Sequence, residues 1–224
     1  MATDIPPLHQ IAGPAEAPSD GENHIVVAGT IAAGKTTLTE GLASRLGLPA
    51  VIERPGANPF LERFYEDRRR WALASQLWFT TDSARQHVEI HRTRGAVQDH
   101  SVYENVHVFG PALAAHGALA EDEWELLLAA TEPVIESLPP PSVVVLVEAP
   151  VEILMERINA RGRAYEADID HDYLAELTDT RRRFFERWDR SPVLRVDSAA
   201  LDLRRSDQAD TIARALAEYL PDLA

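Results

Sequence analysis

Residues 29–36, with the sequence Gly-Thr-Ile-Ala-Ala-Gly-Lys-Thr, decide the fold of this 224-residue chain. The run His24-Ile25-Val26-Val27-Ala28 comes directly before them and is typical of a buried strand. The residues from Lys35 to Leu46 have helical character, and Gly47 ends that pattern. A strand, a glycine-containing turn and a helix that begins with Lys-Thr match the G-x-x-x-x-G-K-[ST] phosphate loop.

Each position of this loop has a physical reason. Glycines let the backbone turn tightly and direct its N–H groups at phosphate oxygens, and the helix start adds its positive dipole end. Lys35 would place a positive charge on the β- and γ-phosphates, and the Thr36 hydroxyl would ligate Mg²⁺. The pattern predicts that ATP is bound by the residues Gly29, Thr30, Ile31, Ala32, Ala33, Gly34, Lys35, Thr36 and Thr37. It does not identify the phosphoryl acceptor, because many protein classes share such loops.

The composition excludes several classes of function. Thirty-six acidic residues outnumber 22 Lys and Arg, whereas a protein that grips a nucleic acid polymer presents a dense basic surface. The absence of cysteine excludes disulfides and thiolate chemistry. The longest apolar stretch, residues 143–147, is far too short to span a bilayer. We therefore expect a cytoplasmic protein that binds neither nucleic acid polymers nor membranes.

The order of apolar and helical patterns predicts a single domain. Residues 1–22 mix Pro, Ala, Gly and acids, and are expected to form a flexible tail before a domain over residues 23–224. Strands are predicted at 24–28, 50–53, 96–99, 143–147 and 193–196. Helices are predicted at 35–46, 60–93, 103–117, 121–137, 151–161, 171–188 and 207–220. Strands that alternate with helices imply crossover connections and a parallel sheet with helices on both faces.

The ends of two other strands carry residue types that phosphoryl transfer uses. In an open α/β sheet the site lies beyond the carboxyl ends of the strands, where Glu53, Arg54 and Asp99 fall. Neighbouring strand residues point to opposite faces, so Glu53 and Arg54 are not expected to face the acceptor together. If Glu53 faces it, the acceptor is a neutral hydroxyl with a carboxylate base; if Arg54 does, the acceptor already carries a phosphate.

A group of arginines follows the strand at 143–147. Arg157 and Arg161 lie four residues apart on one helix face, and Arg163 follows Gly162. Three cations beside a glycine are typical of a mobile lid that closes over phosphates. A solvated basic face, balanced by acidic neighbours on the same helix, would show the same pattern.

Residues 24–198 resemble the deoxyribonucleoside kinase family, especially its bacterial deoxyadenosine/deoxyguanosine kinase branch. The resemblance is carried by segments in a fixed order: residues 29–37, Glu53, 58–65, 75–76, 85–87, 98–104, 157–166 and 191–194. It implies an α/β, three-layer P-loop kinase fold with a five-stranded parallel sheet flanked by helices and an Arg-rich lid. It also implies a homodimer, and the ATP-dependent 5′-phosphorylation of a purine deoxynucleoside or a modified analogue.

The resemblance further implies a role for each matching residue. Glu53 would take the proton from the sugar 5′-hydroxyl, and Tyr65 and Glu166 would hold the 3′-hydroxyl. Gln76 would meet the base edge with two hydrogen bonds, and Phe109 would pack against the base. Mg²⁺ would be held by Thr36 and Asp99. Arg157, Arg161 and Arg163 would form the lid, and Arg157 would stabilise the transferring phosphoryl group. Asn105 would lie beside the nucleoside.

Three positions depart from the family pattern. The family usually has an Arg directly after the carboxylate that ends its third strand, and His100 stands there in this chain. Many members also have an Arg seven residues after the base-reading Gln, partnered by an Asp. Here the two positions are Ser83 and Asn105, so a charged pair is replaced by two neutral groups that can hydrogen-bond. The joint exchange avoids an uncompensated charge and indicates altered base selectivity.

Two other functions remain open at this point. A nucleoside monophosphate kinase of the thymidylate kinase sort shares the fold and would use Arg54 for the phosphate of its acceptor. A weakly active nucleotide-binding subunit of a kinase heterodimer is suggested by His100, but Lys35, Thr36, Glu53 and Asp99 are all present.

Overall fold

The computed structural model describes residues 8–14, 16–17, 23–163, 166 and 169–220. Most of the predicted tail and part of the predicted lid lie outside these residues. The sheet has six strands, in the order β1-β6-β5-β2-β4-β3. They are β1 (Leu8–Ala12), β2 (His24–Gly29), β3 (Ala50–Val51), β4 (Ala96–Asp99), β5 (Val143–Glu148) and β6 (Val193–Asp197).

The α-helices are α1 (Lys35–Leu46), α2 (Leu61–Glu66), α3 (Arg68–Arg92), α4 (Val102–Glu104), α5 (Gly110–Ala115), α6 (Glu121–Ser137), α7 (Val151–Arg161), α8 (His171–Glu186) and α9 (Ser206–Leu216). A π-helical turn, η2 (Asn105–Phe109), joins α4 to α5. Short 3₁₀ turns are η1 (Pro55–Ala57) and η4 (Ala217–Tyr219). Among the described residues, no helix is both long and apolar enough to cross a membrane.

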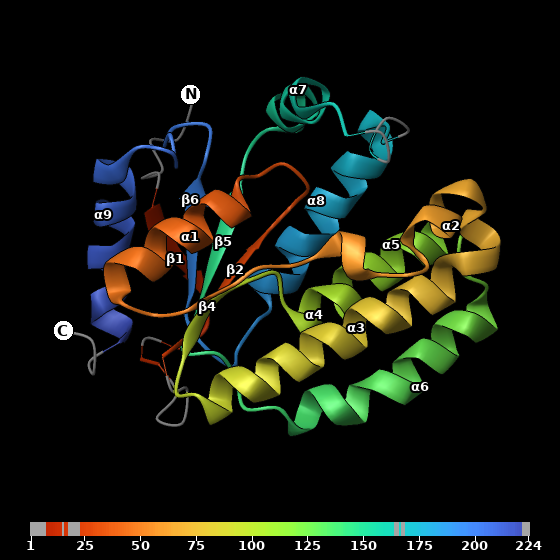
Figure 1. Ribbon diagram of the computed structural model, residues 1–224, viewed down its shortest axis with the longest axis horizontal. Helices are drawn as coiled ribbons and strands as arrows, with labels where there is room; N and C mark the ends of the chain where they lie inside the picture. The colour runs from red at the N-terminus through yellow and green to blue at the C-terminus, as the bar shows by residue number, and fades with distance from the viewer. Residues whose placement is uncertain (1–7, 15, 18–22, 164–165, 167–168, 221–224) are drawn as a thin grey trace.

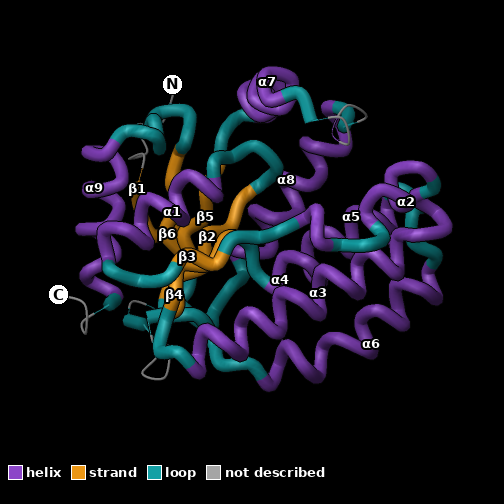
Figure 2. The backbone as a smooth tube through the Cα atoms, in the orientation of Figure 1, coloured by secondary structure: helices purple, strands orange, loops and turns teal. Residues whose placement is uncertain are grey.

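The sheet lies between two helical layers, which confirms the predicted three-layer fold (Figure 1). Residues on β2 alternate between them: Ile25 and Val27 pack with residues of α1 and α9, and Val26 and Ala28 pack with residues of α4 and α8. This alternation follows from the two-residue period of a strand. In the tube view, helices surround the central strands on both sides (Figure 2).

The five predicted strands are parallel to one another, but the strand count was one too low. Residues 8–12, predicted as part of a flexible tail, form β1 and pair antiparallel with β6. The register shifts between Gln10 and Ala12, and the sequence of residues 8–12 lacks the regular alternation by which a strand is recognised. Its pairing with the edge of β6 is a tertiary effect that local sequence does not reveal.

The helix predicted over 60–93 is interrupted at Asp67. The Asp67 side chain accepts a hydrogen bond from the backbone N–H of Arg70 and so caps the start of α3. Aspartate is a favoured capping residue because its carboxylate satisfies an otherwise unpaired N–H group. The helix predicted over 103–117 contains the π-helical turn η2. Both irregularities border the cavity described below, and helix interruptions of this kind are frequent at functional sites.

Candidate active site

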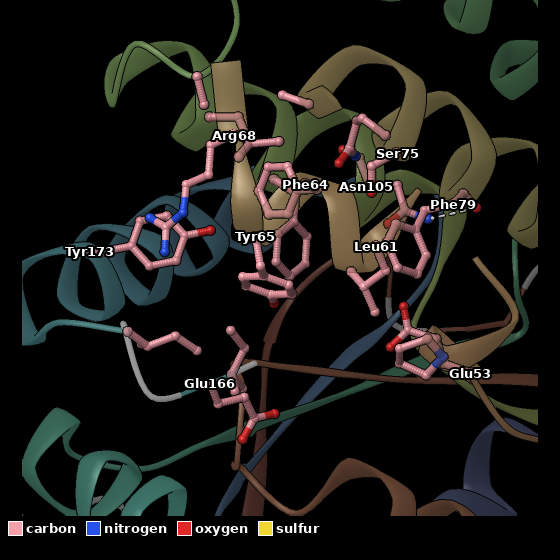
Figure 3. A pocket seen from close by; sticks show the side chains of 18 of the residues that line it. Glu53, Leu61, Phe64, Tyr65, Arg68, Ser75, Phe79, Asn105, Glu166 and Tyr173 are labelled. Atoms are coloured by element: carbon pink, nitrogen blue, oxygen red, sulfur yellow. Dashed lines mark hydrogen bonds between the residues drawn. The ribbon is translucent and has the colours of Figure 1, made fainter. Parts of the chain in front are cut away.

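A cavity of about 550 Å³ opens beyond the carboxyl ends of the parallel strands. The phosphate loop and the start of α1 form one end, and α2, α3 and η2 form its walls. Arg163, Glu166 and Ile169, which lie between α7 and α8 in the sequence, line another side. Figure 3 shows side chains from several of these elements around the cavity, including Glu53, Tyr65, Ser75 and Glu166. Segments far apart in the sequence thus share one chamber large enough for a small organic ligand.

The phosphate loop has the backbone that its glycines allow. Gly34 precedes α1 with a φ of 103°, a left-handed conformation that favours glycine. At Gly29, a Cβ atom would lie 2.6 Å from the carbonyl oxygen of Val147, so a side chain has no room there. The Lys35 ammonium lines the cavity and donates to the Thr30 carbonyl oxygen at 3.3 Å. The predicted loop conformation, with its lysine beside the cavity, is therefore present.

Thr36 and Asp99 meet at the phosphate end of the cavity, as predicted. The Thr36 hydroxyl donates to Oδ2 of Asp99 at 2.5 Å. Oδ1 of Asp99 is buried and has no hydrogen-bond partner in the part of the chain that the structure describes. Oxygen ligands from a hydroxyl and a carboxylate suit Mg²⁺, and a buried carboxylate oxygen without a partner fits such an ion.

Glu53, and not Arg54, belongs to the cavity. Glu53 follows β3 and lines the chamber, whereas Arg54 is exposed and is not part of the lining. Within the described residues, the Glu53 carboxylate accepts no hydrogen bond. A carboxylate placed in this way can accept the proton of a hydroxyl group. Of the two alternatives left open by the sequence, the geometry favours the neutral hydroxyl acceptor.

The residues predicted to hold a nucleoside lie on the walls of this cavity: Tyr65, Gln76, Asn105, Phe109 and Glu166. Gln76 is 95% buried, and its Nε2 donates to the backbone carbonyl oxygen of Asn105. This contact fixes the amide orientation and leaves Oε1 and the second N–H of the amide for a ligand. The same carbonyl oxygen also accepts from the N–H of Gly110 across the π-helical turn.

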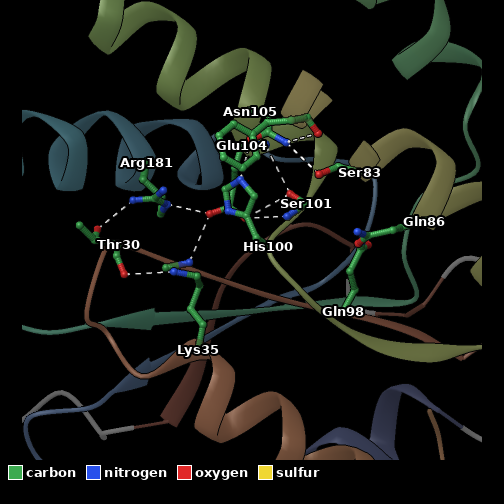
Figure 4. Close-up of polar contacts among 12 residues, drawn as sticks. Thr30, Lys35, Ser83, Gln86, Gln98, His100, Ser101, Glu104, Asn105 and Arg181 are labelled. Atoms are coloured by element: carbon green, nitrogen blue, oxygen red, sulfur yellow. Dashed lines mark hydrogen bonds and ion pairs between the residues drawn. The ribbon is translucent and has the colours of Figure 1, made fainter. Parts of the chain in front are cut away.

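The three departures from the family pattern form one hydrogen-bonded chain (Figure 4). Nδ2 of Asn105 donates to the Ser83 hydroxyl at 2.9 Å and to the Phe79 carbonyl at 3.2 Å. Oδ1 of Asn105 faces Nε2 of His100 at 2.9 Å. Both amide hydrogens of Asn105 are therefore engaged within the protein, and Nε2 of His100 is the donor toward Oδ1. The predicted compatibility of Ser83 with Asn105 is confirmed as a direct contact.

His100 also lies beside Glu104, which is fully buried. Nδ1 of His100 is 3.4 Å from Oε2 of Glu104, and His100 itself has a φ of 72°. The Glu104 carboxylate accepts from the N–H groups of Gly29 and Ser101, which ties it to the phosphate loop. Burial alone would raise the pKa of Glu104, but the charges of His100, Arg181 and Lys35 hold this pKa below its ordinary value.

Arg181 is a functional candidate that the sequence analysis missed. It lies on α8, is 99% buried, and donates from Nη1 to the Thr30 hydroxyl of the phosphate loop at 2.9 Å. Its guanidinium also lies 5.3 Å from the centre of the Phe109 ring. The signal was present in the spacing, because Arg181 occupies the same stripe of α8 as Leu174, Leu177 and Phe185. A charged side chain in an apolar stripe indicates a buried partner.

Arg68, Ser75, Phe79 and Tyr173 also line the cavity and were not predicted. In Figure 3 the Arg68 side chain points toward Tyr173. Burial raises the pKa of Tyr173, so its hydroxyl remains protonated at neutral pH. Single polar and aromatic residues within helices carry no sequence signal that separates cavity lining from ordinary packing.

The three predicted lid arginines make different contacts in this structure. Arg161 and Arg163 line the cavity, and the Arg161 guanidinium makes a two-point contact with the carboxylate of Glu166. Arg157 lies outside the lining. It donates to the loop carbonyl oxygens of Ala32 and Ala33 and to both oxygens of Ser198. In this arrangement Arg157 contacts carbonyl oxygens of the phosphate loop, and its contact with the transferring phosphoryl group stays a prediction.

Comparison with known proteins agrees with this geometry. The sequence profile of the deoxynucleoside kinase family matches residues 25–220. The deoxyadenosine/deoxycytidine kinase of Bacillus subtilis is 30% identical over 188 residues, which cover 83% of this chain and 87% of that protein. The deoxyguanosine kinase of the same organism is 27% identical over 158 residues, covering 68% and 73% of the two chains.

Among solved structures, the deoxyadenosine kinase of M. mycoides superimposes with a TM-score of 0.76 at 23% identity. The superposition covers 86% of this chain and 98% of that one, and shows that the two share a fold. The matching profile spans the phosphate loop, the acceptor side of the cavity and the lid. The chain therefore belongs to the deoxynucleoside kinase family and is a phosphotransferase that uses ATP to phosphorylate a nucleoside hydroxyl group.

Proposed function

We propose that this enzyme phosphorylates the 5′-hydroxyl of a purine deoxynucleoside, or of a modified analogue, with Glu53 as the general base. The observation that carries the proposal is the placement of Glu53 inside the cavity while Arg54 points into solvent. Glu53 shares the chamber with Gln76 on the acceptor side and with Lys35 on the phosphate side. A hydroxyl bound between them would have its base and the phosphoryl donor within one enclosed site.

Base recognition is assigned to Gln76. Its free amide carbonyl and remaining N–H offer one acceptor and one donor, which match a purine edge that presents the complementary pair. Asn105 positions Gln76 through its backbone carbonyl, and its own side chain is occupied by Ser83 and His100. The relatives include enzymes named for deoxyadenosine and for deoxyguanosine, which supports a purine substrate, although one of them is named for deoxycytidine as well.

Mg²⁺ would be held by Asp99 and Thr36 at the phosphate end of the cavity. When bound there, the ion would neutralise charge on the phosphates of ATP. Lys35 and the loop N–H groups would orient the phosphates, and Arg161 and Arg163 would close over them from the lid. Arg181 would supply a permanent positive charge beside Thr30, in a chain that has His100 where the family pattern has an arginine after its third strand.

The decisive assay offers Mg²⁺–ATP together with a panel of acceptors. Ribo- and deoxynucleosides of each base are compared with the corresponding 5′-monophosphates. We expect phosphorylation of a deoxynucleoside and none of its monophosphate. Turnover of the monophosphate alone would identify a nucleotide kinase instead, and binding of ATP without turnover of any acceptor would identify a nucleotide-binding subunit.

The enzyme is also proposed to be a cytoplasmic homodimer that acts in nucleoside salvage. Three large apolar side chains are exposed on the neighbouring helices α3 and α6: Val88, Leu126 and Val134. A second copy of the chain would cover exposed apolar side chains of this kind. Sedimentation of the wild type against Leu126→Glu tests this: the wild type should sediment as a dimer and the variant as a monomer.

A further inference from the structure

Three imidazole rings converge at the opposite end of the sheet from the phosphate loop. His24 is the first residue of β2, and His87 and His91 lie one turn apart on α3. One nitrogen from each ring can be chosen so that all three lie within 4.8 Å of one another. Figure 1 shows the C-terminal end of α3 beside the start of β4, which is the strand that pairs with β2 at this point.

One pair of these nitrogens already has a spacing that suits a first-row metal ion. Nδ1 of His24 and Nε2 of His91 are 3.3 Å apart. Two imidazoles bound to Zn²⁺ at its usual Zn–N distance, in tetrahedral geometry, have their nitrogens about 3.3 Å apart. The pair therefore already has the separation of two ligands on one ion.

The hydrogen bonds of the two buried rings decide which nitrogen of each ring carries the proton. Nε2 of His24 faces Oε1 of Gln98 at 2.9 Å, and Nε2 of His87 faces the Pro139 carbonyl oxygen at 2.8 Å. Both partners are acceptors, so each ring carries its proton on Nε2 and presents the lone pair of Nδ1. Gln98 is itself oriented by donating to Gln86 (Figure 4). Metal-bound histidines commonly donate their second N–H in this way.

Ring packing explains part of this cluster but not all of it. His87 stacks on His91 with 5.0 Å between ring centres, and His24 meets His87 edge to face at 4.6 Å. Packing leaves Nδ1 of His87 buried without a hydrogen-bond partner in the described part of the chain. An ion between the three rings would satisfy the unpaired nitrogen.

We propose that His24, His87 and His91 form a Zn²⁺ site through Nδ1, Nδ1 and Nε2, with a fourth position for water. Imidazole ligands favour Zn²⁺ and its neighbours over Mg²⁺, so this site is chemically distinct from the one at Thr36 and Asp99. His91 is partly exposed and gives the ion a route in. The ion would join β2 to α3, the helix that also carries Gln76 and Ser83 on the cavity wall.

The test uses tag-free full-length protein, stripped with a chelator and kept in excess Mg²⁺ to occupy the carboxylate site. Zn²⁺ alone is titrated by calorimetry, and bound zinc is counted after gel filtration. We expect one Zn²⁺ per chain and a higher melting temperature. His91→Ala and His87→Gln should each abolish Zn²⁺ binding, or lower the Zn²⁺ affinity by at least about 100-fold. Each should also lose the rise in melting temperature. The control is His171→Ala, which removes an exposed imidazole on α8. This variant should bind Zn²⁺ with the same stoichiometry and affinity as the wild type.

Co²⁺ supplies an independent readout. The wild type loaded with Co²⁺ should show the intense visible absorption of a tetrahedral site, and His91→Ala should not. If His87→Gln fails to fold, His91→Ala decides, because the His91 ring is partly exposed and its loss leaves the core intact. Absence of Zn²⁺ from the wild type, or equal Zn²⁺ binding by His91→Ala and His171→Ala, would overturn the proposal.

Discussion

Arg181 and Glu104 form an ion pair in which Nε donates to Oε1 at 2.8 Å, and the two side chains are 2% and 0% exposed. Glu104 also accepts the N–H of Gly29, and Arg181 donates to Thr30. The pair thus connects α8 to the first two residues of the phosphate loop. Its charges are enclosed with the loop, so they contribute to the field that the phosphates of ATP would meet.

The first prediction separates the structural and catalytic roles of Arg181. Arg181→Met leaves a buried carboxylate unpaired and should destabilise the fold by about 3–5 kcal/mol. Adding Glu104→Gln removes that unpaired charge and should restore most of the stability. The turnover number should stay low in the double variant, because the cation beside Thr30 is still missing. Urea unfolding and steady-state kinetics on the three proteins check this; recovery of turnover along with stability would show that Arg181 is only structural.

Glu104 also predicts how stability depends on pH. Its pKa in the folded protein lies below its ordinary value near 4.5, so the folded state keeps the carboxylate ionised when the unfolded state takes up a proton. This contribution to stability is complete above pH 4.5 and is lost as the pH falls through the lower, folded-state pKa. The free energy of unfolding, measured in urea between pH 6 and 3, should fall less steeply in Glu104→Gln than in the wild type. Equal slopes would contradict the assignment.

The contact between Ser83 and Asn105 allows a test of base selectivity. Ser83→Arg or Asn105→Asp alone introduces one charge without its partner, and each should reduce both stability and kcat/KM. The double variant restores the charged pair of the family pattern. Its loss of stability and of kcat/KM should therefore be smaller than the sum of the two single losses, with a coupling energy of about 0.5–3 kcal/mol. A nucleoside panel should show a changed ranking of bases for the double variant. Ser83→Ala, which removes the contact without adding charge, is the control and should cost about 1 kcal/mol.

The sequence predicted those parts of the fold and site that depend on local pattern. The loop at 29–36 and the apolar strand before it predicted the donor side, and the five parallel strands followed from alternating strand and helix patterns. Strand β1 was not predicted because these residues become a strand only by pairing with β6. Arg181 escaped because its partners, Thr30 and Glu104, are 151 and 77 residues away, and only the folded chain brings them together.

Arg157 shows a different limit. Its place in the motif predicted a contact with the phosphoryl group, which stays a prediction, but the motif did not predict its contacts with the loop and with Ser198. Where the guanidinium points depends on Ser198, which follows β6 and offers both its hydroxyl and its carbonyl oxygen. The direction of a long side chain is decided by such tertiary partners, so sequence spacing alone cannot supply it.

The contact between Thr36 and Asp99 predicts the metal dependence of the reaction. Asp99→Asn keeps a hydrogen-bond acceptor for Thr36 but removes the negative charge, so the Mg²⁺ concentration needed for half-maximal rate should rise at least about tenfold. Thr36→Ser retains the hydroxyl and should need close to the wild-type concentration. Initial rates over a Mg²⁺ titration at fixed free ATP give the comparison. An unchanged Mg²⁺ requirement in Asp99→Asn would show that Asp99 does not bind the ion.

Glu53 gives the most direct test of the proposed chemistry. Glu53→Gln preserves the size of the side chain and its ability to hydrogen-bond, but a neutral amide cannot accept the proton of the 5′-hydroxyl. We expect the turnover number to fall about 10²–10⁴-fold. Nucleoside binding should persist, because Gln76, Tyr65 and the aromatic wall are unchanged. Calorimetry with the nucleoside and single-turnover kinetics with ATP measure the two effects separately. Arg54→Gln is the matched control: its side chain points away from the cavity, so its kinetics should equal those of the wild type. A large loss of turnover in Arg54→Gln combined with normal turnover in Glu53→Gln would reverse the assignment and identify a phosphorylated acceptor.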